Sequence, residues 1–150
     1  MACWLMKSEP HAFSIDELKE VKRSSWDGVR NYQARNMMRD DMKKGDLAFF
    51  YHSNCKEPGV VGIMTIVREG YPDNIEFGRK GKHVKINADP ENPTWFMVDV
   101  RYKRKLKRNI TLHELKSFPE LDGLALLRRG NRLSVMPVKD EHWDFIIGLE

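Results

Sequence analysis

The chain has 150 residues, of which 41% are hydrophobic and 32% charged, and its formal net charge is +4. This composition predicts a single domain over residues 1–150 with a buried core, and the mild basicity suits a polyanionic partner. The sequence has no apolar run of membrane-helix length, and its two cysteines are too few for a disulfide framework. We expect no secretory leader, because no basic segment precedes the short apolar stretch at the start. We therefore exclude a membrane protein and a disulfide-rich secreted one, and expect a reduced intracellular protein.

The N-terminal third predicts a strand followed by two helices. The strand is expected over residues 2–7, because a proline soon after it lacks an amide donor and restricts the residue before it. Ser14 and Glu17 have the spacing of a capping box, which predicts a helix that runs to about Val21. A second helix is expected over residues 31–42, with methionines on the face toward the core.

The rest of the chain predicts mainly strands. They are expected over residues 47–52, 60–67, 96–103 and 133–138, with a short one around 83–86 inside the longest loop. Pro137 places the last of these near a sheet edge. Thr111 is expected to cap a short helix, and Asp140 a final helix through Ile147. This order is not the alternation of a parallel α/β fold. It predicts an α+β protein with a small, curled or barrel-like sheet and helices around it.

An eleven-residue segment, residues 26–36, carries two large aromatic side chains, two arginines and two asparagines. A nucleobase has a flat face that an aromatic ring can stack on and a polar edge that amides can read, and its phosphates attract arginine. Trp26 lies between two serines and an Asp-Gly turn, which favours a loop facing a cleft. The same residue also fits a position over the core, and the sequence leaves both interpretations open.

A second polar group, Tyr51-His52-Ser53-Asn54, follows an apolar run and is expected at a strand end. An asparagine amide both donates and accepts, which suits the pairing edge of a base. A plain polar turn explains the segment equally well. His52 and Cys55 stand close in sequence, but no second pair has usable spacing, so we expect no metal site.

Two basic segments complete the candidates for a nucleic-acid interface. Residues 101–108 include six basic side chains, and in a regular strand Arg101, Lys103, Lys105 and Lys107 project from one face. Such a stripe suits a phosphate backbone, although lysines on an edge strand also prevent sheet aggregation. Residues 128–132 hold three arginines around Gly130, which allows close backbone approach.

Signals for an enzyme are weak. The sequence has no nucleophile-elbow pattern, no phosphate-binding loop and no dinucleotide-binding glycine pattern. Its five histidines are scattered, and only His52 lies beside other residues typical of a pocket. His52 and Ser53 are neighbours on a predicted strand, so their side chains are expected on opposite faces.

Taken together, four motifs resemble the EVE domain family. They are Trp4-Leu5-Met6-Lys7-Ser8-Glu9-Pro10, the segment from Trp26 to Asn36, Phe50-Tyr51-His52-Ser53-Asn54, and Arg132-Leu133-Ser134-Val135-Met136-Pro137-Val138. The resemblance covers essentially the whole chain and shows no departure within these motifs. It implies a PUA-like, curved mixed β-barrel with flanking helices. It also implies a cleft for a nucleobase, with modified cytosine in DNA as the leading ligand and modified RNA as a second.

The resemblance also implies roles for individual residues and implies no cofactor. The expected base pocket comprises Ser8, Trp26, Tyr32, Tyr51, Ser53 and Asn54. The expected phosphate contacts are Lys7, Arg30, Arg35, Arg129 and Arg132.

The leading hypothesis is a non-catalytic reader of a modified base, acting as a monomer or weak dimer. We expect it in the cytoplasm or with the nucleoid, or in the nucleus of a eukaryote. The alternative is a small ribonuclease or tRNA-modification enzyme of the ASCH kind, which shares the PUA-like fold, with His52 and Ser53 as its candidates. A third hypothesis is a pocket for a free nucleotide-like metabolite, whose binding would depend little on salt.

Overall fold

The computed structural model describes residues 1–73 and 93–150. The predicted strand around residues 83–86 lies outside the described residues. Among the helices of the described part, none combines the length and apolar character needed to cross a membrane.

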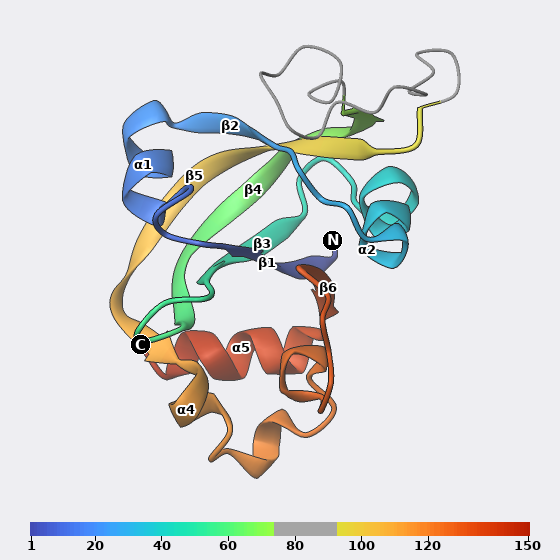
Figure 1. Cartoon of the computed structure of the whole chain (residues 1–150). Helices are drawn as coiled ribbons and strands as arrows, with labels where there is room; N and C mark the ends of the chain where they lie inside the picture. The colour runs from blue at the N-terminus through green and yellow to red at the C-terminus, as the bar shows by residue number, and fades with distance from the viewer. Residues whose placement is uncertain (74–92) are drawn as a thin grey trace.

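Six strands form one sheet in the order β2-β5-β4-β3-β1-β6 (Figure 1). Their bounds are β1 Cys3–Ser8, β2 Arg23–Trp26, β3 Leu47–His52, β4 Gly59–Pro72, β5 Phe96–Thr111 and β6 Val135–Val138. The β1 and β3 strands are parallel, and the other neighbours are antiparallel. The edge position predicted for the strand with Pro137 is confirmed, because β6 ends the sheet. The β4 and β5 strands are longer than predicted, and β2 is an additional strand that the sequence did not predict.

The α+β class and the curved sheet with flanking helices are confirmed. Within the described residues β2 and β6 are the two ends of the strand order and do not pair, so the sheet stays open. The word barrel therefore describes the curvature of the sheet and not a closed ring of hydrogen bonds.

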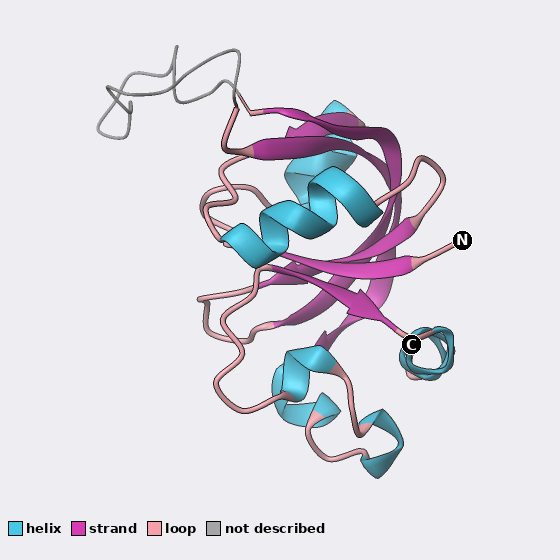
Figure 2. Cartoon of the chain, turned by 90° about the vertical axis from the view of Figure 1, so that its right-hand side faces the viewer, coloured by secondary structure: helices cyan, strands magenta, loops and turns pink. Residues whose placement is uncertain are grey.

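Helices cover both sides of this sheet, and Figure 2 shows α2 and α5 on opposite sides. The helical segments are α1 Ile15–Val21, α2 Tyr32–Asn36 with the π-helical turn η1 Met37–Asp41, α4 Leu112–Leu115, the 3₁₀ turns η2 Pro119–Leu121 and η3 Ala125–Leu127, and α5 Asp140–Gly148. The predicted capping box is confirmed, since Ser14 Oγ accepts from the Glu17 amide and Glu17 Oε1 accepts from the Ser14 amide. Thr111 caps α4. The predicted Asp140 cap is wrong, because Lys139 is the N-cap and Asp140 lies in the first turn.

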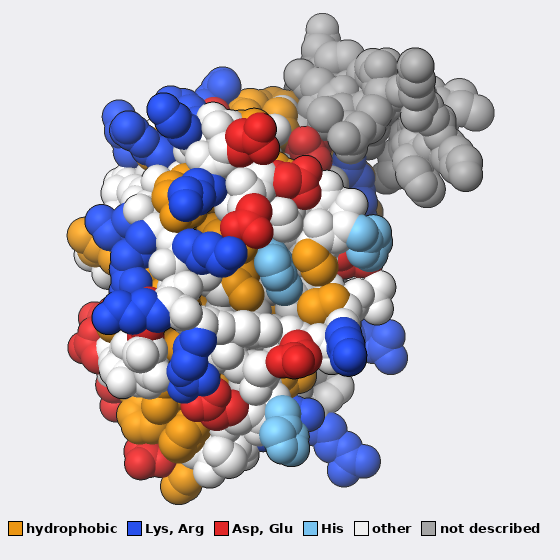
Figure 3. Space-filling model, turned by 90° about the vertical axis from the view of Figure 1, so that its left-hand side faces the viewer, with side chains coloured by type: hydrophobic (Ala, Val, Ile, Leu, Met, Phe, Trp, Pro, Cys, Tyr) orange, Lys and Arg blue, Asp and Glu red, His pale blue; other side chains and the backbone are white. Residues whose placement is uncertain are grey.

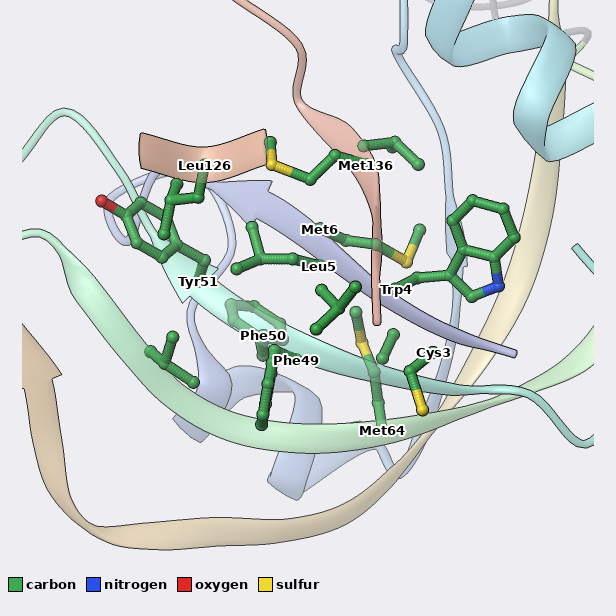
Figure 4. Packing of buried hydrophobic residues seen from close by; sticks show 14 of the residues in the cluster. Cys3, Trp4, Leu5, Met6, Phe49, Phe50, Tyr51, Met64, Leu126 and Met136 are labelled. Atoms are coloured by element: carbon green, nitrogen blue, oxygen red, sulfur yellow. The ribbon is translucent and has the colours of Figure 1, made fainter. Parts of the chain in front are cut away.

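The apolar core lies on both faces of the sheet, because successive side chains of β3 point to opposite faces. We call the face of Phe50 the inner face, where Phe50 contacts Trp26 of β2. The outer face carries Phe49, whose ring stacks on Trp143 of α5 with centroids 3.8 Å apart. Figure 4 shows these β3 rings among the buried side chains of β1, β4 and β6. Both faces of β3 are buried, as its continuous apolar run predicts.

A β-bulge in β5 overturns the predicted single stripe of basic residues. Ile63 and Met64 are adjacent in β4, yet their β5 partners are Arg104 and Tyr102. Lys103 is thus an extra residue, and the alternation of faces changes there. As a result, Arg101 lies on the outer face opposite Thr65, whereas Lys105 lies on the inner face opposite Gly62.

Candidate nucleic-acid interface

Three of the predicted pocket residues meet where the parallel strands β1 and β3 end. Ser8 Oγ donates to the Phe13 carbonyl at 2.7 Å, and the Ser53 amide donates to the Ser8 carbonyl at 3.0 Å. Asn54 has a positive φ of 52° and donates from Nδ2 to Glu9 at 2.8 Å. We call Ser8, His52, Ser53 and Asn54 the β1–β3 rim. Among the described residues the Ser53 hydroxyl has no partner and Asn54 Oδ1 accepts no hydrogen bond, so both remain available to a ligand.

His52 has a structural task within this rim. Its Nε2 accepts from the Ile15 amide at 3.1 Å, which satisfies a free N–H group at the start of α1. Burial lowers the pKa of His52, so the imidazole is neutral at pH 7 and carries its proton on Nδ1. Because the Nε2 lone pair is already used, the geometry gives no support to His52 as a general base.

Trp26 ends strand β2 and does not lie in the predicted loop. Its ring meets Phe50 at 5.3 Å and 82°, and Phe13 at 6.4 Å and 77°. Only 6% of the residue is exposed. The indole N–H donates to no described residue, and its nitrogen is not fully buried. That edge of the ring therefore keeps access to solvent. Phe13 connects this buried ring to the rim, since its carbonyl accepts from Ser8.

Tyr51 and Lys7 lie on the outer face, away from Trp26. The two residues are register partners in the β1–β3 pair, and each follows an inner-face residue by one position. Lys7 Nζ lies 5.8 Å from the Tyr51 ring centroid, and Tyr51 is 2% exposed. Burial raises the pKa of Tyr51 to about 12 and lowers the pKa of Lys7. The structure therefore does not bring Tyr51 onto the face that carries Trp26 and Ser8.

Tyr32 belongs to a separate, exposed group at α2. Its ring stacks on Trp95 with centroids 5.0 Å apart and an interplanar angle of 27°, yet Tyr32 is 59% exposed. The Arg35 guanidinium lies 5.1 Å from the Tyr32 ring, and that of Arg30 lies 5.3 Å from the Trp95 ring. We call Arg30, Tyr32, Arg35 and Trp95 the stacked array. This array is separate from the β1–β3 rim. The rim contacts the segment that leads into α1, and Figure 1 shows α1 and α2 at opposite ends of the sheet.

The two arginines of the stacked array differ in charge balance. Arg30 pairs with Asp73 at 3.1 Å, and the Asp73 side chain is fully buried and also accepts from the Gly28 amide. Arg35 donates to the Thr94 carbonyl and to Asn36 Oδ1. Within residues 1–73 and 93–150, Arg35 has no carboxylate partner. Its charge thus remains open to a phosphate, whereas that of Arg30 is largely neutralised.

Arg129 and Arg132 are exposed on the loop between η3 and β6. Asn131 fixes this loop by donating to the Ala125 carbonyl at 2.6 Å and accepting from the Leu133 amide at 2.9 Å. The loop leads into the β6 strand, which pairs with β1, so it lies near the strand end that carries Lys7.

Trp95, which packs against Tyr32 and Arg30, is the residue of the stacked array that sequence reasoning missed. It lies outside every motif, although a tryptophan directly before a clear strand was a signal. Hollows formed by described residues around η2, α4 and the β6–α5 connection are lined by none of the predicted site residues. In the same part of the chain, no three His, Cys, Asp or Glu side chains gather as metal ligands.

Comparison with known proteins identifies the relatives of this fold. The sequence model of the EVE domain matches residues 2–149. Human thymocyte nuclear protein 1 is 46% identical over 166 residues, covering 98% of this chain and 73% of that protein.

Solved structures agree with these sequence matches. A crystal structure of human THYN1 protein in complex with DNA containing 5-methylcytosine has a TM-score of 0.92 at 45% identity, covering 99% of this chain and 97% of that one. A Pseudomonas syringae protein has a TM-score of 0.94 at 44% identity, with 99% of each chain covered. An ASCH protein from Zymomonas mobilis, at a TM-score of 0.57 and 11% identity, shares the fold alone. Since the family match spans nearly the whole chain, this protein belongs to the EVE domain family.

Proposed function

We propose that this chain binds nucleic acid through a modified base, most simply a methylated cytosine, and does not transform it. The observation that carries the proposal is the crystal structure of human THYN1 protein with DNA containing 5-methylcytosine, which matches 99% of this chain. In a eukaryote the expected place of action is the nucleus, and in a bacterium the cytoplasm or nucleoid.

The base site we propose lies between Trp26 and the β1–β3 rim. The Ser53 hydroxyl and Asn54 Oδ1 can bond the polar edge of a base, and the accessible N–H edge of Trp26 borders the same inner face. Removing a base from its stack costs a few kcal/mol, which hydrogen bonds from the rim and contact with the edge of Trp26 would offset. Tyr51 belongs to the outer face and supports β3 in this proposal.

Of the five predicted phosphate contacts, we propose the four that have no carboxylate partner among the described residues. They are Lys7, Arg35, Arg129 and Arg132. Arg30 holds the backbone at Gly28 through Asp73 and so positions the segment between β2 and α2. Tyr32, with most of its surface exposed, offers a ring to a base that lies outside the pocket.

The test is a titration of two oligonucleotides that differ only in one cytosine 5-methyl group. We expect the methylated one to bind more tightly, by roughly 5- to 150-fold, because a methyl-sized difference in a pocket corresponds to about 1–3 kcal/mol. Ser53→Ala should weaken both complexes, whereas Ser117→Ala, a control whose hydroxyl donates to the Glu114 carbonyl of α4, should not. Equal affinity for the two oligonucleotides would refute the reader function. Cleavage or modification of the oligonucleotide by the purified protein would instead support an enzyme.

A further inference from the structure

Three arginines from three neighbouring strands meet on the outer face of the sheet. Arg23 of β2 lies directly opposite Arg101 of β5. Arg68 of β4 lies opposite Asp99, two residues before Arg101 and on the same face. All three arginines are exposed, and we call them the arginine patch. Figure 3 shows many Lys and Arg side chains on the side of the molecule that carries α1 and β5.

Among the described residues, one carboxylate pairs with this patch, and it contacts only one of the three guanidinium groups. Asp99 pairs with Arg23 at 3.2 Å and accepts from the Tyr71 hydroxyl. The Arg68 guanidinium lies over the Tyr71 ring, 3.5 Å from its centroid. The Arg101 side chain makes no hydrogen bond or ion pair with any residue of the described ranges. The patch therefore keeps an excess of positive charge.

The fold itself gives no reason for a cation at Arg101. Like charges directly opposite each other in an antiparallel pair are destabilising, and Arg23 and Arg101 are such a pair. Protection of a sheet edge does not explain the residue, because at this level β5 is an interior strand with β2 on one side and β4 on the other. A cation in this position, with no protein partner for its side chain, is available to an external anion.

The position of the patch indicates which anion. The β2 strand is an edge of the sheet, and it carries Trp26 on its inner face and Arg23 on its outer face. The two residues are three positions apart, which corresponds to about 10 Å along a strand. This separation is of the order of a few nucleotides, since each strand of a DNA duplex advances about 3.4 Å per nucleotide along the helix axis. A strand that places a base near Trp26 can therefore cross the edge at β2 and reach the patch.

We propose that the arginine patch binds the phosphodiester backbone of the same nucleic-acid strand, a few nucleotides from the modified base. This inference rests on the proposed reader function for the position of that base. The arginines contact phosphate only, so the patch adds affinity without sequence or modification preference. Guanidinium groups suit this task because they bind phosphate oxygens in a bidentate manner.

The test compares Arg101→Gln with Lys116→Gln, an equal loss of charge at an exposed lysine beside α4. With a fluorescent oligonucleotide carrying 5-methylcytosine, Arg101→Gln should weaken binding roughly fivefold and reduce the slope of log affinity against log salt by about one. The ratio of affinities for methylated and unmethylated oligonucleotides should not change. The free energy of unfolding should stay equal or rise, since the repulsion with Arg23 is removed. Lys116→Gln should leave affinity and slope unchanged.

Each outcome decides between the alternatives. Equal salt slopes for the two variants and the wild type would overturn the arginine patch while leaving the reader function intact. If the wild type binds methylated and unmethylated oligonucleotides equally and Arg101→Gln still weakens binding, the reader function alone would be overturned. Arg101-dependent binding to vesicles of anionic lipid that exceeds binding to the oligonucleotide would assign the patch to a membrane surface and refute a nucleic-acid contact.

Discussion

Trp26 and Tyr32 stand six positions apart in one motif, and the fold uses their rings in opposite ways. Trp26 is 6% exposed and is held against Phe13 and Phe50, whereas Tyr32 is 59% exposed and rests on Trp95. The first ring belongs to the inner core that joins β2 to β3. The second covers only the connection between α2 and the start of β5. A shared motif therefore does not give its aromatic residues a shared task, and the strand or helix that carries each ring decides it.

The largest expected effect separates these two rings by stability. Trp26→Ala removes a buried ring and should lower the free energy of unfolding by about 3–5 kcal/mol. Tyr32→Ala removes one exposed aromatic pair, which corresponds to about 0.5–1.5 kcal/mol. Chemical denaturation of both variants measures the difference. Similar losses for the two variants would show that Trp26 does not anchor the inner core.

A milder substitution tests whether the buried ring also contacts a ligand. Trp26→Phe keeps an aromatic ring but removes the accessible indole N–H. If the base lies beside that edge, methyl preference should fall while the protein remains folded. Preserved preference in this variant would place the base away from Trp26. Tyr32→Phe, which keeps the exposed ring, serves as the matched control.

Substitution of the two arginines of the stacked array should have effects of intermediate size, on stability for Arg30 and on binding for Arg35. Arg30→Gln leaves the buried Asp73 carboxylate without its guanidinium and should cost about 1–3 kcal/mol of stability. Arg35→Gln should have a smaller effect on stability and instead reduce the salt slope of oligonucleotide binding by about one. Denaturation and salt titration of both variants check this. A larger salt effect at Arg30 than at Arg35 would contradict the assignment.

Elements that depend on neighbouring residues were predicted well from the sequence, whereas features that depend on residues far apart in the chain were missed. The capping box of Ser14 and Glu17 lies within four residues, so its geometry follows from the sequence alone. The β2 strand was missed because Arg-Ser-Ser-Trp has no apolar alternation and its partner, β5, lies far along the chain. For the same reason, the contact between Tyr32 and Trp95 could not be seen before folding.

The sequence indicated which residue types the candidate site contains better than it indicated which of those residues lie together. Ser8, Ser53 and Asn54 do meet, since parallel strands bring their carboxyl ends to one edge. Tyr51 lies one position before the rim and so on the other face, a consequence of strand alternation that the motif hid. The bulge at Lys103 likewise separates Arg101 from Lys105, because an extra residue changes the face of every later side chain.

The smallest expected effect concerns pH and the rim itself. The unfolded chain has a histidine of pKa about 6.5, and burial lowers the pKa of His52 in the folded chain. Between these two values the unfolded state binds more protons, so stability should rise with pH and fall as the pH drops below about 6.5. The main physical cause is that burial disfavours the charged imidazole, and a protonated imidazole also cannot accept from the Ile15 amide. Free energies of unfolding at about pH 5.5 and pH 7.5 measure this loss.

His52→Gln provides the comparison that isolates this group. A glutamine oxygen can accept from the same amide but does not titrate, so the variant should lose less stability than the wild type over this interval. Carboxylates with a lowered pKa, such as that of Glu114 beside Arg108, titrate below this interval and do not obscure the difference. An equal pH dependence in both proteins would show that the rim does not depend on a neutral His52. Methyl preference should be independent of pH over the same interval, because Ser53 and Asn54 carry no charge.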